Sequence, residues 1–110
     1  MPSAADYREA SARYARLGED LCRQAAALAG WRIETELGSG PAAAKVAERL
    51  GWAAADLNWA GREMARLASE CRWRAEVCET YRQAVRAWWA APQVERGRFP
   101  AQPYLWVPML

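Results

Sequence analysis

The sequence predicts an all-α protein, a long antiparallel helical hairpin followed by an extended C-terminal tail rich in proline and aromatic residues. Apolar or small residues recur in alternating steps of four and three over residues 46–88, the pattern of a helix that packs along another helix. A second amphipathic segment precedes this one, and a Gly-Ser-Gly-Pro stretch separates the two. With 110 residues, 53% of them apolar, the chain is long enough for one domain with a core.

The first helix is expected over residues 4–36. It begins after Ser3, and because Asp6 follows three residues later, the two residues can form a capping box. Its predicted apolar face consists of Tyr7, Ala10, Tyr14, Leu17, Leu21, Gln24, Leu28 and Trp31. Charged residues occupy the opposite side, as expected for a helix with one packed face.

Residues 38–41 form the predicted turn. Gly38 suits a left-handed helix cap, and Pro41 suits the first turn of the next helix, where its missing N–H costs nothing. A loop this short makes the two helices antiparallel neighbours. The helical hairpin is therefore predicted over residues 1–91.

The second helix is expected over residues 41–91 and ends before Pro92. Its predicted seam consists of Val46, Leu50, Ala53, Leu57, Ala60, Met64, Leu67, Cys71, Cys78, Tyr81, Val85 and Trp88. A row of small residues flanks the seam at Ala47, Ala54, Gly61, Ala68 and Ala75. High alanine content and close approach of two helices explain this row equally well. Arg74 interrupts the seam, where it can extend its charge to the edge, pair with an acid on the facing helix or fix the register.

Trp52, Trp59 and Trp73 share one heptad position of the second helix, and Arg66 lies on the same row. Because successive residues turn about 100° around a helix, this row lies roughly 150° from the seam. Exposed apolar surface usually marks an interface, and Trp and Arg are enriched in binding hot spots. The row is predicted to be a protein interface; cover by the chain's own tail and contact with a membrane surface are the alternatives.

The predicted docking tail comprises residues 92–110. Its prolines exclude a helix, and its last twelve residues are too apolar for a free, solvated tail. The tail is expected to dock either on its own hairpin or in a groove of a partner. The predicted contact residues at the end of the second helix and in the tail are Trp88, Trp89, Phe99, Tyr104 and Trp106.

The sequence offers little for catalysis. It contains no His and no Gly-rich loop after a strand, so no catalytic, cofactor-binding or metal-binding residue is predicted, and the protein is expected not to be an enzyme. Asp56, Glu63 and Glu70 recur every seven residues, about 10 Å apart, which is wider than a paired acid and base usually needs. They are interpreted as charges beside the seam that face arginines such as Arg13 or Arg16 on another helix.

The charge and cysteine content limit which classes of partner and which cellular locations are expected. The 15 basic and 13 acidic residues are intermixed, which does not favour a nucleic-acid partner. A membrane partner is not favoured either, since no apolar stretch reaches about 18 residues and the N-terminus lacks a signal-peptide core. The expected location is cytoplasmic, or secreted without a cleaved signal peptide. Cys71 and Cys78 are expected to be free buried thiols, and a bridge from Cys22 to either is the alternative.

The plan of residues 4–89 resembles the Trp-x-Gly family of small type VII secretion proteins. The shared features are the length, two long amphipathic helices and a Gly-containing turn near residue 40. Gly38-Ser39-Gly40 stands where that family has Trp-x-Gly, and neither Tyr81 nor Tyr104 is followed four residues later by the acid of the family's export motif. The resemblance implies a helical-hairpin dimer, often a heterodimer, that is exported folded as a secreted factor or as a targeting partner of larger toxins.

The predicted function is helix-mediated protein–protein assembly, as a type VII secretion-associated adaptor or substrate that forms a homo- or hetero-oligomer. Two alternatives stay open at the level of sequence. A structural component of a phage particle or another large assembly also uses an extended tail to clasp its neighbours. A nucleic-acid-binding module would be retained on DNA in a manner that weakens steeply with salt.

Overall fold

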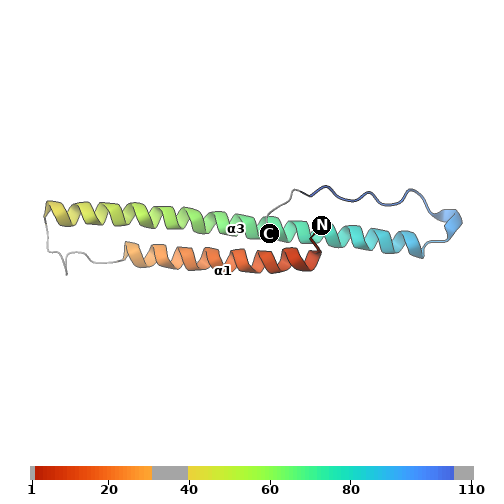
Figure 1. Ribbon diagram of the computed structural model, residues 1–110, viewed down its shortest axis with the longest axis horizontal. Coiled ribbons are helices and arrows are strands. Elements are labelled where there is room, and N and C mark those ends of the chain that lie inside the picture. Colours follow the sequence, from red (N-terminus) through yellow and green to blue (C-terminus); the bar gives the residue numbers. More distant parts are fainter. Residues whose placement is uncertain (1, 31–39, 106–110) are drawn as a thin grey trace. The chain divides into compact units, whose positions relative to one another are not determined.

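The structure is a computed structural model that describes residues 2–30 and 40–105. Its helices are α1 (Ala4–Ala29), α3 (Pro41–Ala90) and the short 3-10 helix η1 (Gln93–Glu95) (Figure 1). There is no strand within the described ranges, and the chain is all-α as predicted.

The contacts divide the chain into two compact units, and each is described by itself. The tail unit comprises residues 1–13 and 67–110, and the turn unit comprises residues 14–66. Both helices contribute residues to both units, so each unit contains a piece of the hairpin.

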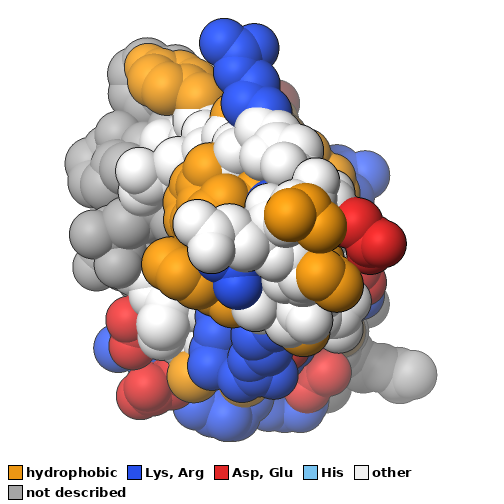
Figure 2. All heavy atoms as spheres, turned by 90° about the vertical axis from the view of Figure 1, so that its right-hand side faces the viewer, with side chains coloured by type: hydrophobic (Ala, Val, Ile, Leu, Met, Phe, Trp, Pro, Cys, Tyr) orange, Lys and Arg blue, Asp and Glu red, His pale blue; other side chains and the backbone are white. Residues whose placement is uncertain are grey.

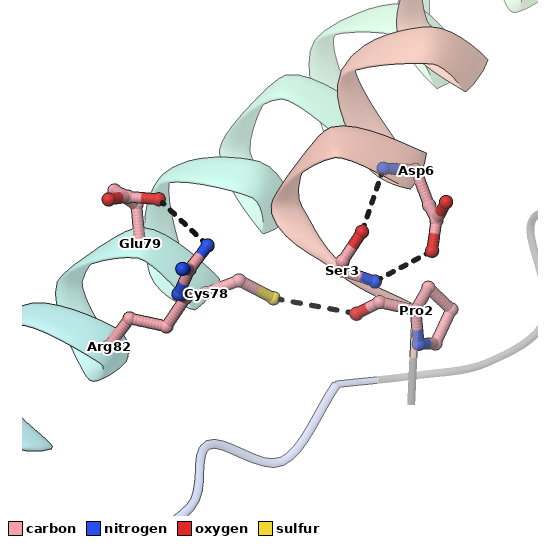
Figure 3. A network of polar contacts seen from close by, with 6 residues as sticks. All are labelled: Pro2, Ser3, Asp6, Cys78, Glu79 and Arg82. Atoms are coloured by element: carbon pink, nitrogen blue, oxygen red, sulfur yellow. Dashed lines mark hydrogen bonds and ion pairs between the residues drawn. The ribbon is translucent and has the colours of Figure 1, made fainter.

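α1 begins with the predicted capping box. The backbone N–H of Ser3 donates to Oδ2 of Asp6 at 2.9 Å, and the backbone N–H of Asp6 donates to Oγ of Ser3 at 3.1 Å (Figure 3). This exchange satisfies two donors that a helix start leaves without partners. α1 ends at Ala29. The expected continuation over residues 31–36 and the expected cap at Gly38 lie outside the described residues.

α3 begins at Pro41, the residue that the sequence places in its first turn. Gly40 precedes it with φ 137°, a conformation that residues with a Cβ rarely adopt. The carbonyl of Gly40 accepts the first bond of the helix from the N–H of Ala44 at 3.0 Å. α3 ends at Ala90, one residue short of the expected end.

In the turn unit the two helices approach each other closely at a pair of glycines. A Cβ placed on Gly18 would lie 2.8 Å from the carbonyl oxygen of Gly61, and a Cβ placed on Gly61 would lie 2.6 Å from Sγ of Cys22. A side chain at Gly18 would need a shift of the backbone, and a side chain at Gly61 would need Cys22 to move and would lie only 3.0 Å from the carbonyl oxygen of Gly18. Ala25 and Ala54 lie one heptad from these glycines on their helices, and both are buried.

The tail unit has the same kind of contact. Oγ of Ser11 donates to the carbonyl oxygen of Ala68 at 2.7 Å, and both residues are buried. One heptad further along, Ala4 and Ala75 are buried as well. Ser11 lies seven residues before Gly18, and Ala68 lies seven residues after Gly61, so each unit has the same antiparallel register.

The packed face of each helix agrees only in part with the predicted seam. Tyr7 and Ala10 of the predicted α1 face and Cys71 and Cys78 of the predicted α3 seam are buried, but other seam residues are not. On α1, Leu17 is 47% exposed and Gln24 is exposed, although both were expected to face the other helix. On α3, the small residues expected beside the seam are its buried centre: Ala54, Gly61, Ala68 and Ala75. Small side chains let two backbones come close, and this contact turns the larger residues toward the flanks. The close approach of two helices, one of the two explanations for the row, therefore holds at these four positions, whereas Ala47, the first residue of the row, is exposed.

Arg74 is the charged residue of the packed interface, with 4% of its surface exposed. Its Nε donates to Oε1 of Glu70 at 3.2 Å, and its guanidinium carbon lies 5.9 Å from the ring centroid of Tyr7. Nη1 of Arg74 and the hydroxyl of Tyr7 are buried without a hydrogen-bond partner. Of the alternatives for Arg74, pairing with an acid is observed, but the acid lies on its own helix.

The acidic row of α3 also pairs within its helix. Arg66 donates from Nε to Oε2 of Glu63 at 3.1 Å, and Glu70 accepts from Arg74. Glu63 and Glu70 thus pair with arginines of their own helix and not with Arg13 or Arg16, and Asp56 forms no ion pair within the described residues. Residues three or four positions apart on a helix are neighbours, so Arg66 and Arg74 reach the acids without crossing to α1.

All three cysteines are free. Cys71 and Cys78 are buried, as predicted, and Cys22 is half-buried. Burial raises the pKa of the Cys71 thiol, with the nearby Arg74 acting in the opposite direction, and burial also raises the pKa of Cys78. Both thiols therefore stay protonated near neutral pH and pack as small hydrophobic groups.

Candidate functional site

The turn unit carries an exposed aromatic surface on α3. Trp52 and Trp59 are 61% and 62% exposed, and they lie seven residues apart on the side of the helix opposite to the buried Ala54 and Gly61. We call this surface the indole face. The sequence predicted that these tryptophans point away from the hairpin contact, and their exposure agrees with that orientation.

Small residues lie beside the two indoles, with Ala55 between them and Gly51 just before Trp52. Ala55 is exposed between them, and a Cβ placed on Gly51 would meet no other atom within 4 Å. The indole face therefore has two large rings with a shallow space between them, and a side chain of another helix can fill such a space.

Charges of both signs border the indole face. Glu48 and Asp56 lie within one turn of Trp52, and Arg62 lies within one turn of Trp59. Arg66, the fourth member of the predicted row, is exposed and forms its ion pair with Glu63. A mixed border of this kind is typical of the polar rim around an apolar contact.

Trp73, the remaining tryptophan of the predicted row, belongs to the tail unit. It is 54% exposed and lines a groove together with Pro100 and Pro103 of the C-terminal tail. Trp73 therefore lies near the chain's own tail, but the tail does not cover it.

The tail is attached to the end of α3 by Arg96. Its Nε donates to the carbonyl oxygen of Ala91 at 3.0 Å, and its Nη2 donates to that of Trp89 at 2.9 Å. The guanidinium also lies 5.0 Å and 5.2 Å from the ring centroids of Trp88 and Trp89. Arg96 thus satisfies carbonyl groups that the end of a helix leaves without partners, a role that the sequence analysis missed.

Trp88 provides a second attachment. Its Nε1 donates to the carbonyl oxygen of Gly97 at 3.0 Å, and its ring meets the edge of Phe99 at a centroid distance of 5.0 Å. The chain then runs back along α3 to the buried Leu105 (Figure 1). The described part of the tail, residues 92–105, thus contacts the chain's own α3, which agrees with one of the two expected outcomes.

The other predicted contact residues remain largely open. Trp89 is exposed although its ring stacks on Arg96, Tyr104 is 88% exposed, and Trp106 lies outside the described residues. Seen from the C-terminal end of α3, hydrophobic and basic side chains are interspersed on the surface (Figure 2).

A groove of about 480 Å³ separates the tail from α3. It is lined by Trp73, Glu76, Val77, Thr80, Tyr81, Ala84, Pro100, Ala101 and Pro103. We call it the tail groove. It lies on the side of α3 that faces away from α1, because Cys71, Ala75 and Cys78 fill the side toward α1. No sequence pattern predicted this groove. It forms only because the tail turns back after α3 and runs beside it.

A second groove, of about 530 Å³, lies in the turn unit. Its lining consists of Gln24, Ala27, Leu28, Leu50 and Leu57. These residues flank the small-residue contact, where the larger side chains of the predicted seam have been turned outward.

The described residues hold no cluster of three or more His, Cys, Asp or Glu side chains that would suit a metal ion. None of the described helices is long and apolar enough to cross a membrane. Comparisons of this chain with family models, with curated proteins and with solved structures find no match.

Proposed function

We propose that this chain acts in helix-mediated protein–protein assembly, as one subunit of a dimer or heterodimer. The indole face of α3 is the contact surface, and a second helical hairpin is the partner. The observation that carries the proposal is the exposure of Trp52 and Trp59, 61% and 62%, on the side of α3 that α1 does not cover. Paired exposed indoles supply the kind of contact that dominates binding energy.

The spacing of the indole face favours a helical partner. The two rings lie one heptad apart, which is the period of a packed helix, and the small Ala55 leaves room between them. Glu48 lies toward one end of the face and Arg66 toward the other, so an antiparallel helix of the same kind brings acid opposite base. Each Trp buries roughly 150–250 Å², and a stable interface needs about 1,200 Å² or more, so the contact extends along the helix.

Within this class we favour a type VII secretion-associated adaptor or substrate. The chain resembles the Trp-x-Gly family in its length, its two long amphipathic helices and its turn near residue 40. On this proposal the partner is another small hairpin that is exported together with it.

The test compares two alanine variants of equally exposed tryptophans. Trp59→Ala removes the centre of the indole face, whereas Trp89→Ala removes a similarly exposed indole at the far end of α3. We expect sedimentation equilibrium to show association weakened about thirty-fold for Trp59→Ala, the effect of a hot-spot residue, and little changed for Trp89→Ala. Far-UV circular dichroism checks that both variants stay helical.

The partner is identified by co-purification from the native cell, followed by mass measurement of the intact complex. A complex that survives Trp59→Ala unchanged contradicts the indole face as the interface. A wild-type chain that stays monomeric alone and captures no helical partner contradicts the proposed function.

A further inference from the structure

We propose that the tail groove is a binding site for a small amphiphilic organic cation, an alkylammonium ion. Its charged head lies at Trp73 and Glu76, and its alkyl chain lies along Val77, Ala84 and Pro103. This site is separate from the indole face and does not depend on the function proposed above.

The size and lining of the groove suit a ligand of this class. Small-molecule sites commonly enclose about 300–1,000 Å³ and combine apolar walls with few polar groups. The tail groove has about 480 Å³, with Val77, Ala84 and three tail residues as its apolar walls. An alkyl chain of moderate length gains hydrophobic stabilisation from such a wall.

The charge of the lining selects a cation. Glu76 is the one charged residue among the lining residues, and it forms no ion pair with another described residue. Trp73 precedes it by three positions, so the carboxylate and the half-exposed indole lie side by side on α3. An aromatic face and a carboxylate both attract a cation, and the carboxylate repels an anion.

The tail wall is held in place before any ligand arrives. Arg96 and Trp88 fasten the tail at one end of the groove, and Leu105 is buried beyond the other end. Pro100 and Pro103 stand between these attachments, and proline restricts the backbone to a narrow range of φ. A preformed wall reduces the ordering that binding would otherwise require.

The experiment measures binding of octyltrimethylammonium, below its micelle concentration, by isothermal titration calorimetry and by NMR shifts of the Trp73 indole N–H. Octyl sulfate and octyl glucoside serve as the anionic and neutral comparisons. We expect saturable one-to-one binding of the cation that is about five-fold or more tighter than binding of the sulfate. Equal affinity for the cation and the sulfate would overturn the proposal.

Matched variants locate the site. Glu76→Gln removes the charge and is expected to weaken cation binding about five-fold while leaving the neutral ligand unaffected. Glu79→Gln, a control on the same helix outside the lining, is expected to change nothing. Cation binding that is the same in Glu76→Gln and in the wild type would contradict the assignment.

Two further variants test the walls. Ala84→Trp fills the groove from α3, and Phe99→Ala weakens the attachment of the tail, so each is expected to abolish saturable binding of both the cation and the neutral ligand. Circular dichroism confirms that α3 stays helical in each. Undiminished binding in Ala84→Trp would place the ligand elsewhere. Trp59→Ala is expected to bind the cation normally, so failure here and failure of the assembly proposal are told apart.

Discussion

At the scale of single residues, the guanidinium of Arg74 is a charge inside a helix contact built from small residues. One nitrogen reaches Glu70, and another is buried without a partner. Burying a charge costs several kcal/mol unless its hydrogen bonds are satisfied, so this ion pair is not by itself evidence of stability. A single polar residue in a seam can also penalise shifted pairings of two helices, which is the remaining alternative for Arg74.

Replacement of Arg74 by Met tests this balance. We expect Arg74→Met to leave the free energy of unfolding unchanged or to raise it by about 1 kcal/mol, because Met keeps the apolar stem and removes the incompletely paired charge. Glu70 is partly exposed and stays solvated in the variant. Urea denaturation measures the change, and Tyr7→Phe, which removes the other unpartnered group, is the companion variant. A loss of more than about 2 kcal/mol would show that the charge stabilises the fold.

The capping box makes one contribution to stability dependent on pH. Hydrogen bonds from the backbone N–H and the side chain of Ser3 hold the pKa of Asp6 below its ordinary value of 3.8. A carboxyl with a lowered pKa stabilises the folded state above its unfolded pKa, and the effect disappears as the pH falls through the folded pKa. Asp6→Asn is therefore expected to be less stable than the wild type near neutral pH and equally stable in strong acid.

Thermal unfolding monitored by circular dichroism, from neutral pH to below pH 3.8, measures that difference. NMR titration of the Asp6 carboxyl gives the pKa directly, and Ser3→Ala is expected to return it toward its ordinary value. A stability difference that persists unchanged in strong acid would show that the charge of Asp6 is not its source.

At the scale of the elements, the contact between α1 and α3 depends on the absence of side chains. Gly18 and Gly61 meet backbone to backbone, and Ser11 bonds to the backbone of Ala68. Glycine inside a helix costs about 1 kcal/mol relative to alanine. The close approach of the two helices, with its additional van der Waals contact, offsets that cost at these positions.

Two glycine-to-alanine variants separate helix propensity from packing. Gly51→Ala gains propensity without touching another atom, so we expect it to raise the free energy of unfolding by about 0.5–1 kcal/mol. Gly18→Ala places its Cβ 2.8 Å from a backbone oxygen that no rotamer change can move, so we expect a loss of about 1–3 kcal/mol. Urea denaturation of both variants measures the changes. Stabilisation of the two by equal amounts would contradict the close contact.

At the scale of the whole molecule, α3 has apolar residues on the side that faces α1 and on the outer side. In the tail unit the chain covers part of the outer side itself, because the tail returns along it. In the turn unit the outer side remains exposed at Trp52 and Trp59. The same heptad row therefore has two environments, one beside the tail and one open, and the open one is the surface proposed for assembly.

Much of this architecture was predictable from local chemistry. The start of α1 follows from Ser3 and Asp6, and the start of α3 follows from Pro41, because caps act within one turn of a helix. The exposure of Trp52 and Trp59 follows from helical period alone. The choice between two rows as the packed face did not follow, since large apolar residues and small ones occupied adjacent stripes of the same helix.

Periodicity and caps thus established two long helices, their antiparallel arrangement and an outer aromatic row, because each of these depends on residues within a few positions of one another. Tertiary structure decided the small-residue contact, the capping of α3 by Arg96 and the groove between α3 and the tail. Each of these depends on how closely distant backbones approach, and that distance is set by the combined packing of both partners. Gly18 and Gly61 are the clearest example. In the sequence each glycine only lowers the helix propensity of its segment, whereas in the structure the pair allows the close contact of the two helices.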